Sequence, residues 1–156
     1  MRRKDKEITD FTVIEDVLEK ALVCRIALNG EDGPYIVPVN FGYRPGFIYA
    51  HSAREGKKID LIRRDDRVCF EVETDVSFTP GNSGPCNWTT KYRSVIGFGK
   101  ASLVSDPDEK LEALHIILGH YSPGKFEIPA NACEKLAIIK IAIDSMTGKI
   151  SGFPKQ

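Results

Sequence analysis

The stretch HSAREGKKIDLI, which begins at His51, carries a histidine, a serine, an arginine and two adjacent lysines where a strand-like run gives way to a helix-like run. A helix N-terminus presents free amides and a partial positive charge, so together with Lys57 and Lys58 it favours a phosphate. Ser52 and Glu55 also fit a capping box, in which Ser52 accepts a hydrogen bond from the amide of Glu55. Both interpretations are open from the residues alone, and so is the role of His51.

Two other segments suit the binding of a planar cofactor. The strand-like run YIVPVNF contains Pro38, which donates no ladder hydrogen bond, so the backbone there either meets a ligand or lies at a sheet edge. The segment WTTKYRSVIGFGK begins with an aromatic and polar cluster that fits either the flank of a planar ring or an exposed barrel rim. The residues of this cluster are Trp88, Tyr92, Arg93 and Ser94.

The sequence lacks the residue patterns of nucleophilic hydrolases, dinucleotide-binding proteins and metal sites. The sequence contains no G-x-S-x-G and no cysteine beside a histidine, and Gly97-Phe98-Gly99 lacks the third glycine of a dinucleotide fingerprint. His115 and His120 are five apart on a helix pattern, and the four cysteines show no metal-ligand spacing. We therefore expect no metal and a cofactor that brings its own chemistry.

The elements that must position these residues are short strands and three helices. Apolar spacing and capping patterns predict helices from about Thr12 to Ala21, from the opening stretch to about Arg64, and onward from a cap at Asp106. Strand patterns cover residues 23–28, 35–41, 47–50, 67–73, 91–104, 136–143 and a short run near 150. Only one strand–helix–strand unit occurs, so an antiparallel barrel with peripheral helices is the expected closure.

Two parts of this pattern point to interfaces. Residues 74–87 are rich in glycine, proline, serine and asparagine, which predicts a long loop with a functional or interface role. The run LAIIKIAI is apolar on both faces, so we expect one face of this strand to meet another subunit.

Length and composition describe one soluble domain. The 156 residues fall within the usual size of about 100–200 residues per domain, so residues 1–156 are expected to form a single domain with residues 1–7 as a flexible basic tail. Lys plus Arg and Asp plus Glu are 22 each, a balance that argues against a nucleic-acid binder. No apolar run reaches about 18 residues, so we expect no membrane span, and the expected compartment is the cytoplasm.

Several ordered blocks resemble the FMN-binding split-barrel proteins related to pyridoxamine 5'-phosphate oxidase. These blocks are CRIAL with Arg25, PYIVPVNFGY, IYAHSAREGKKIDLI, RVCFEV, WTTKYRSVIGFGKASLV and DPDEKLEAL, and they span about residues 8–145. The branch that the sequence most resembles is the nitroimidazole-resistance (Nim-type) flavin proteins. The resemblance implies a mainly β (α+β) fold, a six-stranded antiparallel Greek-key split β-barrel with about three peripheral helices.

The resemblance also implies a homodimer with two FMN molecules at its interface. It assigns the phosphate and ribityl end of FMN to His51, Ser52, Lys57 and Lys58. It assigns the isoalloxazine lining to Val39 and Asn40, with Arg25 nearby. The partner chain or the barrel rim would contribute Trp88, Tyr92, Arg93 and Ser94. His51 matches a histidine proposed to act close to the flavin in the Nim-type branch, and it is the one candidate catalytic residue.

The resemblance favours an FMN-dependent oxidoreductase that passes hydride from NAD(P)H through flavin N5 to a nitroimidazole or another small nitroaromatic molecule. Authentic pyridoxamine phosphate oxidases end in a basic, histidine-containing substrate motif, whereas this chain ends in SGFPKQ with no histidine after His120, which argues against vitamin B6 oxidation. Three alternatives are open. They are a flavin store, sensor or electron carrier without turnover, a structural dimer without a ligand, and a haem-handling barrel with His51, His115 or His120 as axial ligand.

Overall fold

The structure, a computed structural model, describes residues 3–81, 84–124, 126–129 and 132–153. The strands in these residues are β1 (Glu7–Ile8), β2 (Cys24–Gly30), β3 (Gly33–Val39), β4 (Phe41–Arg44), β5 (Phe47–Ser52), β6 (Arg67–Thr79), β7 (Thr89–Leu103) and β8 (Ala137–Ser151). The helices are α1 (Phe11–Lys20), α2 (Lys57–Arg64), α3 (Pro107–Tyr121) and α4 (Ala132–Lys135). Two short 3-10 turns, η1 (Lys4–Lys6) and η2 (Pro85–Asn87), complete the described elements. None of the helices in these residues is long and apolar enough to cross a membrane.

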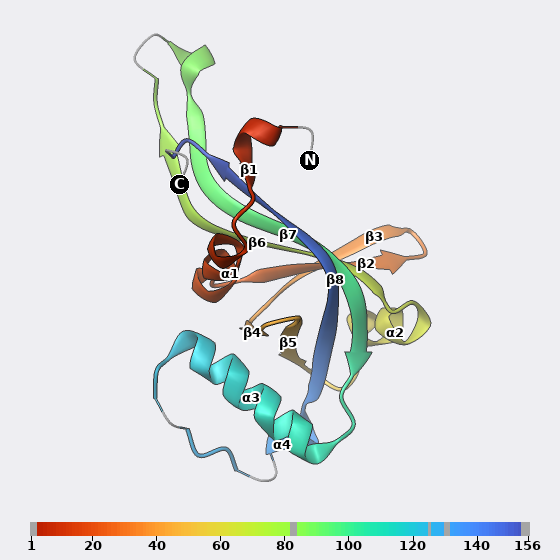
Figure 1. Ribbon diagram of the computed structural model, residues 1–156. Helices are drawn as coiled ribbons and strands as arrows, with labels where there is room; N and C mark the ends of the chain where they lie inside the picture. The colour runs from red at the N-terminus through yellow and green to blue at the C-terminus, as the bar shows by residue number, and fades with distance from the viewer. Residues whose placement is uncertain (1–2, 82–83, 125, 130–131, 154–156) are drawn as a thin grey trace.

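One antiparallel sheet of eight strands wraps around the core in the spatial order β3-β2-β6-β7-β8-β5-β4, with β1 beside β8 (Figure 1). The end strands β3 and β4 do not pair with each other in the described residues, so the sheet is not closed. The expected split barrel is therefore confirmed. It has two more strands than the expected six, because the chain breaks at Asn40 between β3 and β4 and because β1 adds to β8.

Residues 4–7 are structured where the sequence predicted a flexible tail over residues 1–7, and residues 1 and 2 lie outside the described residues. Residues 4–6 form η1, and Glu7 begins β1, where it pairs with Lys149 of β8. The Lys6 ammonium donates a hydrogen bond to Ser151 Oγ at 2.9 Å. Backbone pairing and this side-chain contact hold residues 4–8 against the barrel.

The first half of β8 is buried on both faces by this chain, at Ile138 on one face and at Ile139 and Ile141 on the other. Ile139 and Ile141 pack into the barrel core, while Ile138 belongs to a second apolar cluster with Leu114 and Ile117 of α3. Packing against α3 within the chain therefore accounts for the second apolar face of LAIIKIAI, and contact of this strand with another subunit stays a prediction.

Residues 74–79 continue strand β6 where the sequence predicted a long loop over residues 74–87. β6 continues to Thr79 and pairs with β7 up to Thr89, beyond a bulge between Thr74 and Ser77. Asp75 within the bulge has a positive φ of 55°. Residues 75–81 and 84–92, called the arm, project away from the barrel (Figure 1). Backbone pairing with β7 holds this segment in a strand. None of the residues from Thr74 to Thr79 is buried as a whole, so pairing rather than burial explains why a loop-like composition forms a strand here.

The N-cap residue of α3 is the one that the sequence predicted, whereas the N-cap of α1 is a different residue. The side chain of Asp106 accepts a hydrogen bond from the amide of Glu109 at 2.8 Å, as expected for the start of α3. The cap of α1 is Asp10, which accepts from the amide of Thr12 at 2.9 Å. Asp10 lies two residues before Thr12, where the sequence predicted the helix to begin, and its side chain satisfies a free amide of the first turn.

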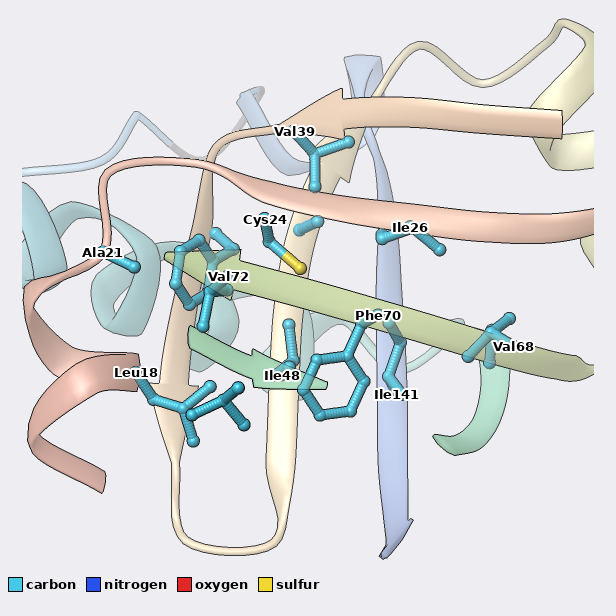
Figure 2. Packing of buried hydrophobic residues seen from close by; sticks show 14 of the residues in the cluster. Leu18, Ala21, Cys24, Ile26, Val39, Ile48, Val68, Phe70, Val72 and Ile141 are labelled. Atoms are coloured by element: carbon cyan, nitrogen blue, oxygen red, sulfur yellow. The ribbon is translucent and has the colours of Figure 1, made fainter. Parts of the chain in front are cut away.

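The main core lies between the curved sheet, α1 and α2. Figure 2 shows Cys24, Val39, Phe70 and neighbouring apolar side chains converging on this interior. A β-carbon added at Gly97 would lie 2.2 Å from Cζ of Phe70, so the glycine leaves room for that ring. The Gly97-Phe98-Gly99 pattern thus has a packing role at its first residue.

We expect Gly97→Ala to destabilise the fold by about 1–3 kcal/mol, because the added methyl group overpacks the core against Phe70. Gly119→Ala is the matched control, since no atom lies within 4 Å of an added β-carbon in α3. The control should stabilise the fold by about 0.5–1 kcal/mol. Urea unfolding at one protein concentration measures both variants, and equal midpoints for the two would contradict this packing.

Candidate functional site

The junction between β5 and α2 holds a buried hydroxyl with no partner. Ser52 is 4% exposed, and its Oγ makes no hydrogen bond within the described residues. Helix α2 begins only at Lys57, after Gly56 with a φ of 120°, and no side chain caps it. The predicted capping box is therefore wrong, because pairing with Ala137 holds Ser52 in β5. A buried hydroxyl without a partner costs about 1–3 kcal/mol and marks a place where a ligand would satisfy it.

The two lysines of α2 differ in their surroundings. Lys57 Nζ lies 5.0 Å from the centre of the Tyr35 ring, in a cation–π contact. The surface hollow beside Lys57 is also lined by the carboxylates of Glu31, Asp32 and Asp60. Lys58 is half-buried and makes no ion pair or hydrogen bond in the part of the chain that the structure describes. Lys58 and the uncapped first turn of α2 thus supply the positive charge at the junction.

His51 and Ser52 face opposite sides of β5. Successive side chains of a strand alternate between its faces, and Ala50 packs in the barrel core on the same face as Ser52. His51 shares its face with Tyr49, which packs against α3, and it is exposed at the rim of a cavity beside Leu114. The structure therefore places Ser52 on the barrel side of β5, shortly before α2 begins at Lys57, and His51 on the other face of the strand.

The break between β3 and β4 lies beside the end of β5. Phe41 pairs with Ala50, so Asn40 lies one step beyond the ladder, in register with His51. Asn40 is exposed, whereas Val39 is 8% exposed and packs its side chain into the core. Asn40 is thus placed to meet a ligand with its side chain, and Val39 only with its backbone.

The C-terminal end of α3 fixes this break, which the sequence did not reveal. Tyr121 Oη accepts a hydrogen bond from the amide of Phe41 at 3.0 Å and donates one to the carbonyl of Leu22 at 2.9 Å. The His120 ring lies 4.4 Å from the Phe41 ring, and its Nε2 is 2.7 Å from the carbonyl oxygen of Ala21. The spacing of α3 indicated a buried stripe, but no local signal pointed to these contacts 80 or more residues away.

Arg25 lies on the outer face of the sheet between two carboxylates. Its guanidinium is 3.1 Å from Glu71 and 3.1 Å from Glu73. Burial and the charge of Glu73 raise the pKa of Glu71, and Arg25 opposes that rise. Arg25 also lines a cavity of about 360 Å³ with Thr74, whose buried Oγ1 has no partner in the described residues. Sequence reasoning missed Thr74, because it placed this residue in the predicted loop and gave no sign that the hydroxyl is buried.

The remaining predicted site residues lie in or beside the arm: Trp88, Tyr92, Arg93 and Ser94. Trp88 is 51% exposed and packs edge-to-face on Phe78, with ring centres 5.5 Å apart. Arg93 pairs with Asp75 of the bulge. Figure 1 shows the arm and α2 at opposite ends of the molecule. A single chain therefore does not bring the arm to the β5–α2 junction.

The chain is similar to a known protein family and to a solved structure. The family model of pyridoxamine 5'-phosphate oxidase matches residues 11–150. A candidate 5-nitroimidazole antibiotic resistance protein from Bacteroides thetaiotaomicron is 32% identical, with 92% of this chain and 86% of that chain covered and a TM-score of 0.82. No match was found among curated proteins.

Two structures of lower identity share the fold. The flavocytochrome from Azotobacter vinelandii is 20% identical, with 99% of this chain and 73% of that chain covered and a TM-score of 0.84. The FAD- and haem-binding protein from Mycobacterium smegmatis is 19% identical, with 97% and 76% covered and a TM-score of 0.83. Since the family model spans most of the sequence and the sheet is a split barrel, the chain belongs to the pyridoxamine 5'-phosphate oxidase family.

Proposed function

We propose that this protein is a flavoprotein that binds FMN at the β5–α2 junction. The observation that carries the proposal is the buried, unpartnered Ser52 hydroxyl beside the uncapped start of α2. A phosphate accepts hydrogen bonds, so it would satisfy Ser52 and the first-turn amides while Lys58 offsets its charge. Asn40 lies at the break beside this junction and is proposed to contact the flavin ring. A bound flavin supplies hydride transfer at N5, and the protein supplies binding and orientation.

We expect Ser52→Ala to weaken FMN binding about 10- to 150-fold, since a hydrogen bond to a charged group contributes about 1.5–3 kcal/mol. The stability of the flavin-free protein should stay equal or rise, because the substitution removes an unsatisfied buried hydroxyl. Quenching of flavin fluorescence measures the dissociation constant, and urea unfolding measures the stability.

The paired variant Lys57→Ala with Lys58→Ala extends this experiment. It should weaken FMN binding about a hundredfold or more, through loss of charge-assisted contacts to the phosphate. Lys110→Ala is the matched control, because Lys110 is also a half-buried lysine on a helix, far from the junction in sequence. Unchanged FMN affinity in both Ser52→Ala and the lysine pair would exclude a phosphate at the junction.

We further propose that two copies of the chain pair through the outer face of the sheet. Ile36, Ala27, Cys69 and Phe98 follow one another across β3, β2, β6 and β7, and Ile36 and Phe98 are 61% and 57% exposed. The arm adds three more exposed apolar side chains, which are Val76, Phe78 and Trp88. Apolar surface of this extent marks an interaction site. Pairing would let the arm of one chain approach the junction of the other, which a single chain does not achieve.

We expect Phe98→Glu to convert the dimer to a monomer, because the carboxylate would be buried without a partner at the interface. Phe11→Glu is the control, since Phe11 is 53% exposed on α1 and outside this face. Sedimentation velocity distinguishes the two states. A Phe98→Glu protein that stays dimeric, or a wild-type protein that is already monomeric, would rule out pairing through this face.

We propose that the bound flavin turns over, with NAD(P)H as donor and a nitroaromatic molecule as acceptor. The support is the likeness to the 32% identical candidate nitroimidazole resistance protein. A flavin store or sensor is the rival within the same fold. A haem site has less support, because the His120 ring is already engaged with Ala21 and Phe41.

Anaerobic mixing of the FMN-loaded protein with NADPH tests this step. Loss of the oxidised flavin absorbance, followed by its return when a nitroimidazole is added, is the result expected of the enzyme. NADH should be tested in parallel, because no contact within the described residues distinguishes NADH from NADPH as the donor. Flavin that stays oxidised with both donors would leave a binding protein without turnover.

A further inference from the structure

A further cavity lies on the α3 face of β5, across the strand from the proposed phosphate site. It measures about 360 Å³, opens to the surface, and is lined by α3, residues 126–129, Leu136 and the end of β5. Its apolar lining residues are Leu114, Ile117, Leu118, Phe126, Ile128, Pro129 and Leu136. His51 and Glu127 are the only polar side chains among the residues that line it in the described chain.

We propose that this cavity binds the electron acceptor as an uncharged, largely apolar ring compound. This inference rests on the proposed flavin function and names the class of molecule that the same site would reduce. The volume is at the small end of ligand pockets, which range over about 300–1,000 Å³, while an apolar cavity of about 150 Å³ already holds benzene. One substituted ring, or two fused rings, is therefore the size that fits.

The charges around the cavity select against ionic compounds. No lysine or arginine belongs to its described lining, so an anion would lose its hydration without an ion-pair partner. The Glu127 carboxylate would repel an anion further. The apolar side chains from α3 provide no ligand or hydrogen-bond acceptor to replace the hydration of a strongly hydrated cation. A neutral compound enters this cavity without these costs.

His51 connects the cavity to the flavin site. It is the only imidazole in the described lining, and Asn40 lies in register with it at the end of the β4–β5 ladder. A ring in the cavity would thus lie beside the residue proposed to contact the flavin. We assign His51 as the group that donates a hydrogen bond to a polar substituent of the bound ring.

The flavin-free protein tests the binding step directly, with 4-fluoronitrobenzene as probe and ¹⁹F NMR as readout. We expect saturable binding of this neutral probe and at least tenfold weaker binding of the anion 4-fluorobenzoate. Leu118→Trp fills the cavity and should weaken probe binding at least tenfold. Leu111→Trp places the same residue on α3 outside the lining and should leave binding unchanged. Circular dichroism and the thermal midpoint confirm that both variants fold.

Two further measurements test the hydrogen bond from His51 and the proximity of the cavity to the flavin. His51→Phe should weaken binding of 4-fluoronitrobenzene about 2- to 12-fold, the size of one neutral hydrogen bond, and leave fluorobenzene binding unchanged. Saturation with FMN should shift the ¹⁹F resonance of the bound probe.

Several results would overturn the inference. Probe binding that does not saturate, or that Leu118→Trp leaves intact, would show that the cavity takes no such ligand. A probe resonance that FMN binding leaves unmoved would remove the acceptor role. Failure of FMN to bind while the probe still binds at this cavity would instead overturn the proposed function and leave the ligand class of the cavity standing.

Discussion

The alternation of side chains along β5 is the constraint on which the candidate site depends. Ser52 lies on the barrel side of this strand and His51 on the α3 side, so two adjacent residues serve two different spaces. One space is the junction with α2, where a phosphate would find a buried hydroxyl and uncapped amides. The other is the apolar cavity under α3. A register shift of one residue would exchange the two side chains and remove both spaces.

Contacts between helix α3 and strand β4 fix the position of the cavity wall relative to the barrel. A β-carbon at Gly42 would lie 2.7 Å from the backbone of Ile116, so the helix approaches β4 closely enough to require glycine there. Tyr121 then bridges Phe41 and Leu22 through its hydroxyl. The end of β4 and the helix that walls the cavity are thus fixed to each other, which keeps Asn40 at the open end of the barrel.

Local patterns in the sequence predicted those elements whose stabilising contacts are local. The Asp106 cap and the end of α2 near Arg64 both depend on residues close in sequence. The split-barrel architecture also followed, through the resemblance of ordered blocks to a known family.

Long-range contacts decided what the sequence did not predict. The Ser52–Glu55 pattern fits a capping box, but pairing with Ala137 of β8 keeps Ser52 in a strand. The second face of β8 packs against α3 at Ile138, and the composition of residues 74–87 gave no sign that β6 would continue to Thr79. The division between His51 and Ser52 depends on the strand register, which only the folded chain reveals.

The central claim is that the β5–α2 junction holds a flavin phosphate, and the most direct measurement is the identity of the small molecule carried by the purified protein. The protein should be yellow, and mass spectrometry of the molecule released on heating should give FMN at about one per chain. A colourless protein that takes up no added FMN would contradict the account. A haem absorbance band in place of the flavin spectrum would contradict it as well.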